Sequence, residues 1–290
     1  MNSSRHFELE RLAAALAAGA MMELRLTPKP GLVDLIDNGS HPDLSLPLME
    51  RSIGIVAVYL EEIVVSLGAR EPFARQQEIA VRAERQLSAQ LGTNTHKGYI
   101  FLSGMLLIAR HHAGASDEGS VRSALSAVSR AFFAAAPERD THGERARRTF
   151  HTGGIVREAL DAYPSLFEGA LPVFRRVMRQ CACVNTASFA MMATLMQTID
   201  DTTTLHRGGI DGLERVRRDG RALERIIAEG GDCAAFLGRL NDDYKRLGLT
   251  IGGVADMLGI AFACLIFGNE IAPAAHSAER VFPVPSPLAC

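Results

Sequence analysis

Apolar residues recur at helical spacing along almost the whole chain of 290 residues. Between residues 7 and 25, Leu9, Leu12, Leu16 and Met22 fall on related faces of a helix. Stretches that alternate strictly between apolar and polar residues are nearly absent, so we expect no substantial sheet. The pattern predicts an all-α, single-domain bundle with many helices. The expected helices cover residues 7–25, 48–68, 73–91, 97–113, 119–135, 155–162, 165–180, 184–200, 211–229, 233–247 and 252–269.

Three polar connections interrupt this pattern, at residues 27–45, 136–154 and 200–212. Long connections within a compact helical domain are commonly functional or disordered. We expect one helical domain over residues 1–270, followed by a proline-containing tail at 271–290 that is extended or disordered. A chain of this length can bury an ample hydrophobic core in one domain.

The composition is that of an ordinary soluble globular protein, with 47% hydrophobic and 22% charged residues. The formal net charge is −2, so no overall basic field attracts nucleic acid or an anionic membrane. An anionic ligand must therefore be bound by local charges. The five cysteines form no CxxC pair, and the N-terminal stretch lacks the apolar core of a signal peptide. These features predict reduced thiols and a cytoplasmic protein.

The segment T-P-K-P-G-L-V-D, at residues 27–34, is the most constrained part of these connections, and we call it the elbow. Pro28 and Pro30 fix their own φ angles and bias the preceding residues towards extended geometry, which holds Lys29 on a stiff support. Gly31 allows a sharp turn directly behind the lysine. We interpret the elbow as a device that presents the Lys29 ammonium to an anionic ligand.

Asn94 and Thr95 precede an expected helix start at Lys97. Either residue can cap this helix, and the free N–H groups of its first turn, together with the helix dipole, favour an anion there. Lys97 adds a full positive charge beside that position. The alternative is a well-capped helix without a ligand, and this stretch alone does not separate the two.

Asp200 and Asp201 are predicted to close an apolar helix, where the helix dipole disfavours negative charge. Adjacent carboxylates in that position suggest a hard cation such as Mg²⁺. Arg207 follows on a turn with Gly208 and Gly209, a setting suited to bidentate phosphate binding. Taken alone, this stretch fits a solvated loop with an ordinary Asx turn better than a metal site.

Asp256 stands in an otherwise apolar segment behind the Gly252-Gly253 turn, and a lone acid of this kind is more often a cap or a paired structural group. Together, the polar stretches offer three cations, several carboxylates and glycine turns, which suit a polyphosphate with Mg²⁺. The sequence contains no P-loop, no Rossmann glycine motif and no HExxH pair for zinc. The DDxxD motif of all-α prenyl diphosphate enzymes also fails, because Thr204 occupies the third acidic position.

The polar stretches carry sequence motifs in a fixed order. E-x-x-x-T-P-K-P-G-L-V-D begins at Glu23, G-x-H-x-D at Gly39 and N-T-H-K-G at Asn94. D-D-T-x-x-x-H-R-G-G begins at Asp200. A looser match, which has G-x-x-x-E followed by an aromatic-Pro pair, covers residues 154–172.

From about residue 10 to residue 268, this combination resembles the triphosphoribosyl-dephospho-CoA synthase family, which serves citrate lyase and malonate decarboxylase. The resemblance implies an all-helical transferase that moves the triphosphoribosyl group of ATP to the 2′-hydroxyl of 3′-dephospho-CoA and releases adenine, with Mg²⁺ or Mn²⁺ as cofactor. The product would be a prosthetic-group precursor for an acyl carrier subunit. Two alternatives stay open: a relative that transfers part of ATP to another acceptor, and a non-catalytic ATP-binding sensor. The sequence permits a homodimer but does not fix the oligomeric state.

The resemblance also implies roles for individual residues. Breaking a ribosyl–adenine bond builds positive charge at the anomeric carbon, which a carboxylate can stabilise. The expected catalytic residues are Asp34, Asp43, His41 and His96. The expected ATP-binding residues are Lys29, Gly31, Asn94, Thr95, Lys97, Gly98, His206, Arg207, Gly208, Gly209, Gly252, Gly253 and Asp256. The expected metal ligands are Glu23, Asp200 and Asp201.

One stretch departs from the family pattern. Where the family has S-P-G-G-S-A-D-L, this chain has T-I-G-G-V-A-D-M at residues 250–257. If the replaced residues contact the acceptor, the acceptor differs in this chain, whereas the ATP-side motifs are intact. The sequence therefore supports ATP as the donor more firmly than dephospho-CoA as the acceptor.

Overall fold

The computed structural model describes residues 3–93, 95–135 and 153–273. Within these ranges the chain forms eleven α-helices, one π-helical turn and no strand, so the predicted all-α class is confirmed. The first five helices are α1 (Ser3–Arg25), α2 (Leu46–Gly68), α3 (Phe73–Leu91), α4 (Lys97–His112) and α5 (Glu118–Ala135). The later elements are α7 (Gly154–Leu160), the π-helical turn η1 (Ser165–Ala170), α8 (Leu171–Cys181), α9 (Val184–Thr198), α10 (Thr202–Ala228), α11 (Cys233–Leu247) and α12 (Gly252–Phe267).

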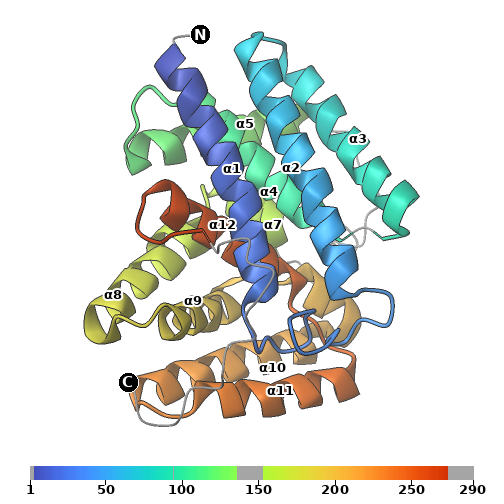
Figure 1. Cartoon of the computed structure of the whole chain (residues 1–290), viewed down its shortest axis with the longest axis vertical. Coiled ribbons are helices and arrows are strands. Elements are labelled where there is room, and N and C mark those ends of the chain that lie inside the picture. The colour runs from blue at the N-terminus through green and yellow to red at the C-terminus, as the bar shows by residue number, and fades with distance from the viewer. Residues whose placement is uncertain (1–2, 94, 136–152, 274–290) are drawn as a thin grey trace.

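Helix α1 runs through the middle of the molecule and packs mainly against α12, with further contacts to α2 and α4 (Figure 1). Helix α12 is apolar around nearly its whole circumference, as expected for a helix buried on most sides. The two helices approach closely where Gly19 faces Gly259, since a Cβ atom on Gly19 would collide with the Gly259 carbonyl oxygen. Small residues at this crossing therefore bring the first and last helices of the described chain together.

Helices α10 and α11 lie side by side across the end of α1 that carries Arg25, at the bottom of Figure 1. The connection between α1 and α2, residues 26–45, contains the elbow and contacts α11. The first turns of α10 and α12 share a hydrogen-bonded carboxylate, and a side chain of α12 reaches the first turn of α4. The fold thus gathers the end of α1, the elbow and three helix starts in one region.

Most helix boundaries lie within two residues of the predicted ones, but the polar break expected at 200–212 was wrong. Helix α10 begins at Thr202, and Asp201 is its N-cap. The Asp201 carboxylate accepts the backbone N–H groups of Thr203 and Thr204, each at 2.9 Å. A carboxylate at a helix start is stabilised by the dipole, which is the opposite of the setting predicted from the sequence. The interruption is instead a kink at Gly209, where φ is 62° and ψ is −160°.

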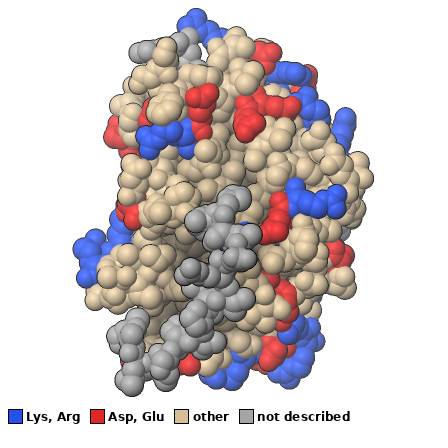
Figure 2. Space-filling view, viewed as in Figure 1, with Lys and Arg blue, Asp and Glu red and all other residues tan. Residues whose placement is uncertain are grey.

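Acidic and basic side chains are interspersed over the face shown in Figure 2, in keeping with the net charge of −2. No helix in the described ranges is long and apolar enough to cross a membrane. Nearly all of the expected connection at 136–154 and most of the expected tail at 271–290 lie outside the described residues.

Candidate active site

Asp34 is a buried carboxylate that organises the elbow. Its Oδ2 atom accepts the backbone N–H of Lys29 at 2.9 Å. Its Oδ1 atom accepts the N–H groups of Ile36 at 2.7 Å and Asp37 at 3.3 Å. Both oxygens of this 3% exposed residue are therefore engaged by backbone N–H groups, one between the two prolines and two after Asp34 itself. Asp34 fixes the shape of the turn, and its catalytic role stays a prediction.

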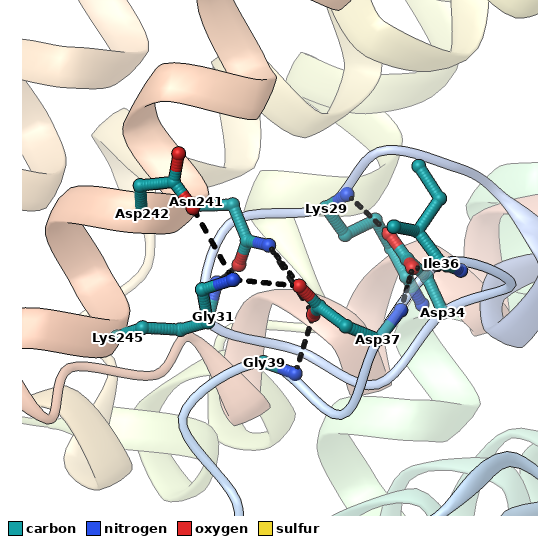
Figure 3. A network of polar contacts seen from close by, with 9 residues as sticks. All are labelled: Lys29, Gly31, Asp34, Ile36, Asp37, Gly39, Asn241, Asp242 and Lys245. Atoms are coloured by element: carbon teal, nitrogen blue, oxygen red, sulfur yellow. Dashed lines mark hydrogen bonds and ion pairs between the residues drawn. The ribbon is translucent and has the colours of Figure 1, made fainter.

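Asp37 ties the same connection to α11 (Figure 3). Its carboxylate accepts hydrogen bonds from the Gly39 N–H and from the Asn241 amide, and it pairs with the Lys245 ammonium at 2.7 Å. The Asn241 amide oxygen accepts the N–H of Gly31 at 2.9 Å. Although partial burial opposes the change, the hydrogen bonds from Lys245, Gly39 and Asn241 lower the pKa of the Asp37 carboxyl. This network holds the connection against α11.

Sequence reasoning missed Asn241 and Lys245. The available signal was a polar amide on the buried face of the amphipathic helix α11, since Asn241 is only 6% exposed. Gly31 has a φ of +70°, and a Cβ atom there would collide with the Leu249 carbonyl oxygen. Close packing of the elbow therefore accounts for Gly31, whose contact with ATP stays a prediction.

Lys29 points into the protein. Its Nζ donates to Oε1 of Glu23 at 2.5 Å and to the Glu23 carbonyl oxygen at 2.6 Å, and the residue is 1% exposed. Burial raises the pKa of the Glu23 carboxyl, and the neighbouring Lys29 ammonium opposes that rise. The prolines frame the elbow, but its lysine pins the end of α1 through a buried ion pair. The contact of Lys29 with phosphate stays a prediction.

Asp201 bridges the first turns of two helices. Besides capping α10, it accepts the backbone N–H of Val254 in α12 through Oδ2 at 3.0 Å. Gly253 leaves room for this carboxylate, because a Cβ atom there would lie 3.1 Å from Oδ2. Burial raises the pKa of Asp201, against the lowering effect of its backbone N–H donors. The carboxylate therefore joins α10 to α12.

Asp256 reaches from α12 to the N-terminal end of α4. Its carboxyl accepts the backbone N–H of Tyr99 and lies so close to Gly98 that any Cβ atom there would collide with it. Burial raises the pKa of Asp256 well above its ordinary value, and the Glu23 and Asp201 carboxylates raise it further. The anion expected at this helix start is, in this structure, an internal carboxylate.

The predicted cap of α4 was wrong. His96, with a φ of 58°, is the N-cap residue, and its side chain makes no capping hydrogen bond. Its Nδ1 atom contacts the Ser52 hydroxyl at 2.7 Å. The Thr95 hydroxyl donates to the Met49 sulfur at 3.2 Å, and Asn94 lies outside the described residues. The first turn of α4 faces Asp256, which explains why its N–H groups do not require a local side-chain cap.

The three cations expected to bind phosphate have separate partners. Lys97 pairs with Glu84 of α3 at 3.0 Å. Arg207, near the start of α10, donates to the Ser40 carbonyl oxygen at 2.8 Å. Lys29 is enclosed at the end of α1, as described above. Their joint action on a phosphate group stays a prediction.

Two histidines near this region are neutral at pH 7. His41 accepts from Arg207 through Nδ1 at 3.2 Å, so its Nε2–H donates to the Thr250 hydroxyl at 2.9 Å. Burial, and then the Arg207 charge, lower the pKa of His41 to about 4. Burial, and then the Lys29 charge, lower the pKa of His96 to about 4. Both imidazoles therefore act here as neutral hydrogen-bonding groups.

The remaining predicted site residues are either exposed or closely packed glycines. Asp43 and His206 are exposed. Gly208 packs under a leucine side chain that a Cβ atom would strike. Gly252 lies against Thr203, whose hydroxyl oxygen would be 3.1 Å from a Cβ atom. The two glycines thus permit close packing around the starts of α10 and α12.

The three expected metal ligands are not brought together. Glu23 is paired with a lysine and Asp201 is engaged by backbone N–H groups. Asp200 accepts from Arg217 at 2.6 Å and from the Gly153 N–H at 3.4 Å. In the part of the chain that the structure describes, no group of three or more His, Cys, Asp or Glu side chains is arranged to hold a metal ion. The adjacent aspartates instead face two different neighbourhoods.

The region therefore combines acids with helix starts. Burial raises the pKa of Glu23, Asp201 and Asp256, and the Glu23 and Asp201 carboxylates raise the pKa of Asp256 further. The N-terminal ends of α4, α10 and α12, which carry partial positive charge, lie beside these groups. Fixed dipoles and poorly solvated carboxyls are the elements with which enzymes stabilise developing charge. The arrangement fits an enzyme that handles a charged substrate.

Comparison with known families identifies the class. The family described as ATP:dephospho-CoA triphosphoribosyl transferase matches residues 9–271. The chain belongs to this family, and the resemblance inferred from the motifs is confirmed.

Curated relatives agree along most of the chain. A Klebsiella pneumoniae protein named 2-(5''-triphosphoribosyl)-3'-dephosphocoenzyme-A synthase is 32% identical over 272 residues, covering 90% of this chain and 94% of the relative. A Stutzerimonas stutzeri (strain A1501) protein, named "Probable 2-(5''-triphosphoribosyl)-3'-dephosphocoenzyme-A synthase", is 30% identical over 287 residues, covering 92% and 94%. No solved structure matches the chain significantly.

Proposed function

We propose that the protein transfers the triphosphoribosyl group of ATP to dephospho-CoA. The observation that carries the proposal is the family match over residues 9–271, whose description names this reaction. Relatives that align with about nine-tenths of the chain bear the name of the corresponding synthase. We expect the enzyme to be cytoplasmic, and a homodimer is compatible with the sequence.

The reaction breaks the bond between C1′ of the ribose and the adenine ring and forms a bond between C1′ and a hydroxyl oxygen of the acceptor. The hydroxyl proton ends on adenine, so atoms and charge balance. Positive charge develops at C1′ as the base departs, and a carboxylate beside that carbon stabilises it. Asp256 is the candidate for this role, because it lies in a poorly solvated region where burial, and then the Glu23 and Asp201 carboxylates, raise its pKa.

A divalent cation belongs to the proposal because ATP carries several negative charges. Mg²⁺ typically binds through one or two carboxylates together with phosphates and water. The trio Glu23, Asp200 and Asp201 does not fit a closed protein site, since each member already has partners within the chain. Asp200 stays a candidate ligand, and Asp200→Asn should weaken the Mg²⁺ dependence of adenine release; an unaltered Mg²⁺ titration would remove it.

The departure from the family pattern at residues 250–257 bears on the acceptor. Thr250 and Ile251 stand where the family has Ser-Pro, and both are buried. The Thr250 hydroxyl is engaged by His41, and its carbonyl oxygen accepts from the Thr204 hydroxyl at 2.7 Å. The Thr250-Ile251 pair, which replaces Ser-Pro, is thus part of a packed junction between α10 and α12. This supports a structural reason for the change and leaves dephospho-CoA as the proposed acceptor.

The test is a chromatographic assay of the purified protein with Mg²⁺-ATP, with and without 3′-dephospho-CoA. Adenine release that depends on dephospho-CoA, with a product heavier by one triphosphoribosyl unit, is the expected result. Adenine released without that product would keep ATP as donor and overturn dephospho-CoA as acceptor. ATP binding with no adenine release from either mixture would favour a non-catalytic ATP sensor.

A further inference from the structure

A cavity of about 450 Å³ lies on the side of the molecule formed by α7, η1 and the end of α9. Its volume is within the range of small-molecule sites. The residues that matter for its chemistry are Gly154, Glu158, Asp161, Pro164, Glu168 and Asp200. Gly154, Glu158 and Pro164 are the residues of the looser sequence match at 154–172, for which the elbow region offers no role. The match therefore gathers around one cavity.

Glu158 distinguishes this cavity from an ordinary charged surface. The residue is 8% exposed, and no described residue forms an ion pair with it. Its Oε1 atom accepts the Ser165 hydroxyl at 2.6 Å, and Oε2 accepts the Ser165 N–H at 3.3 Å. Burial raises the pKa of Glu158. A glutamate is rarely buried without an ion-pair partner, and among the described residues Glu158 has none. The cavity beside it is where a ligand N–H group can reach its carboxyl group.

The other carboxylates of the cavity already have cationic partners. Asp161 pairs with Arg157 at 3.3 Å at the exposed rim, Asp200 pairs with Arg217, and Glu168 pairs with an arginine of α5. A lining of this kind presents many acceptor oxygens and repels phosphate. It selects a ligand group that is neutral, or cationic, and rich in N–H donors.

Asp200 and Asp201 place the cavity beside the acidic region at the helix starts. Consecutive Cα atoms are about 3.8 Å apart, yet Asp200 lines the cavity while Asp201 joins α10 to α12. A ligand that spans this pair would have one end in the cavity and the other near the N-terminal ends of α10 and α12. A nucleotide is divided in this way, because its base is a neutral group with N–H donors and its phosphates lie at the other end.

We propose that this cavity is the binding site for the nucleobase of the donor, an adenine recognised through its exocyclic amine by the carboxyl group of Glu158. The inference rests on the proposed function, because removal of a triphosphoribosyl group from ATP leaves adenine. Gly154, which has no side chain, and the ring of Pro164 both line the cavity, and a purine ring can pack against surfaces of this kind. Arg157 at the rim can donate to a ring nitrogen.

The experiment is a calorimetric titration of the full chain with three neutral probes: adenine, hypoxanthine and pantetheine. Hypoxanthine carries a carbonyl oxygen where adenine carries the amine, so a carboxyl acceptor should discriminate against it. Adenine should bind at least tenfold more tightly than hypoxanthine, and Glu158→Gln should weaken adenine binding at least tenfold. Glu78→Gln, an exposed acid on α3, is the matched control and should bind adenine as the wild type does.

Equal binding of adenine and hypoxanthine, or adenine binding unchanged by Glu158→Gln, would overturn the inference. Binding of pantetheine in preference to adenine would also overturn it and assign the cavity to the acceptor. If Glu158→Gln does not fold, hydrogen exchange of the wild type decides the matter. Adenine should then slow exchange in residues 154–165, and the absence of such protection would reject the site.

Failure of the nucleobase site and failure of the proposed reaction give different results. Adenine that binds at Glu158, in a protein that forms no triphosphoribosyl product, would support the nucleobase site and contradict the transferase. If the protein forms the triphosphoribosyl product but its adenine affinity is unchanged by Glu158→Gln, the transferase is supported and the nucleobase site is contradicted.

Discussion

The elbow and the cavity on the α7 side each contain one buried carboxylate, and the two regions use it differently. In the elbow, both oxygens of Asp34 accept backbone N–H groups, and Asp37, which follows the elbow, is bound to α11. In the cavity, Glu158 has one serine partner and borders about 450 Å³ of space. A polar motif can therefore hold the chain or hold a ligand, and the open space beside the Glu158 carboxylate separates the two cases.

Lys29→Ala should give the largest effect, because it leaves Glu23 buried without its cation. Breaking one partner of a buried ion pair costs about 3–5 kcal/mol of stability. Urea denaturation of the variant and the wild type measures the loss. Lys245→Ala is the control, since its pair with Asp37 is partly exposed and should contribute less than about 1 kcal/mol. A variant as stable as the wild type, but unable to bind ATP, would restore Lys29 as a phosphate-binding group.

Asp34→Ala should destabilise the protein by about 2–4 kcal/mol, because three backbone N–H groups, one in the elbow and two directly after it, lose their acceptor. Asp34→Asn keeps one acceptor oxygen and should lose less. Thermal unfolding of both variants tests this order. If both variants kept wild-type stability while adenine release was abolished, Asp34 would be catalytic, and the contrast between the elbow and the cavity would fail.

Gly98→Ala extends the contrast to the start of α4. The added Cβ atom would collide with the Asp256 carboxyl, which must move. We expect the rate of adenine release to fall by about tenfold or more, equivalent to about 1.4 kcal/mol in the barrier. Gly54→Ala on α2, where a Cβ atom meets nothing within 4 Å, is the matched control and should leave the rate unchanged. Equal rates for the two variants would show that the position of Asp256 does not affect the reaction.

The smallest expected effect concerns the histidine titrations, in which the NMR signals of two imidazoles should not change with pH. Because the pKa values of His41 and His96 are lowered to about 4, their NMR signals should not shift between pH 8 and pH 6. As the pH falls from about 6.5 towards 4, both histidines take up a proton in the unfolded chain but stay neutral in the folded protein. The two histidines therefore lower the free energy of unfolding in this pH range. The raised pKa of Asp256 acts in the opposite direction, since that carboxyl takes up a proton first in the folded state. A midpoint near 6.5 for either histidine would contradict the burial described here.

Helical periodicity predicted the fold class and most helix boundaries because burial repeats along one face of the helices, as in α3 and α11. It failed at 200–212, where Asp201 starts a helix that polar residues had concealed. The motifs located the elbow and the helix starts, but they could not show that Lys29 faces Glu23 or that Asp256 lies over Gly98. Such pairings join residues far apart in the sequence, and local patterns carry no information about them. Glu158 was visible as a motif residue, but its burial beside a cavity was not.

The most direct test of the account is a crystal structure of the protein with ATP bound and no acceptor present. We predict the adenine in the cavity on the α7 side, with its amine at the Glu158 carboxyl, and the triphosphate on the other side of Asp200 and Asp201. The hydrogen bonds of Asp34 and Asp37 should be unchanged. An adenine bound elsewhere, or a ribose in contact with Asp34, would contradict the division between carboxylates that hold the chain and carboxylates that hold the ligand.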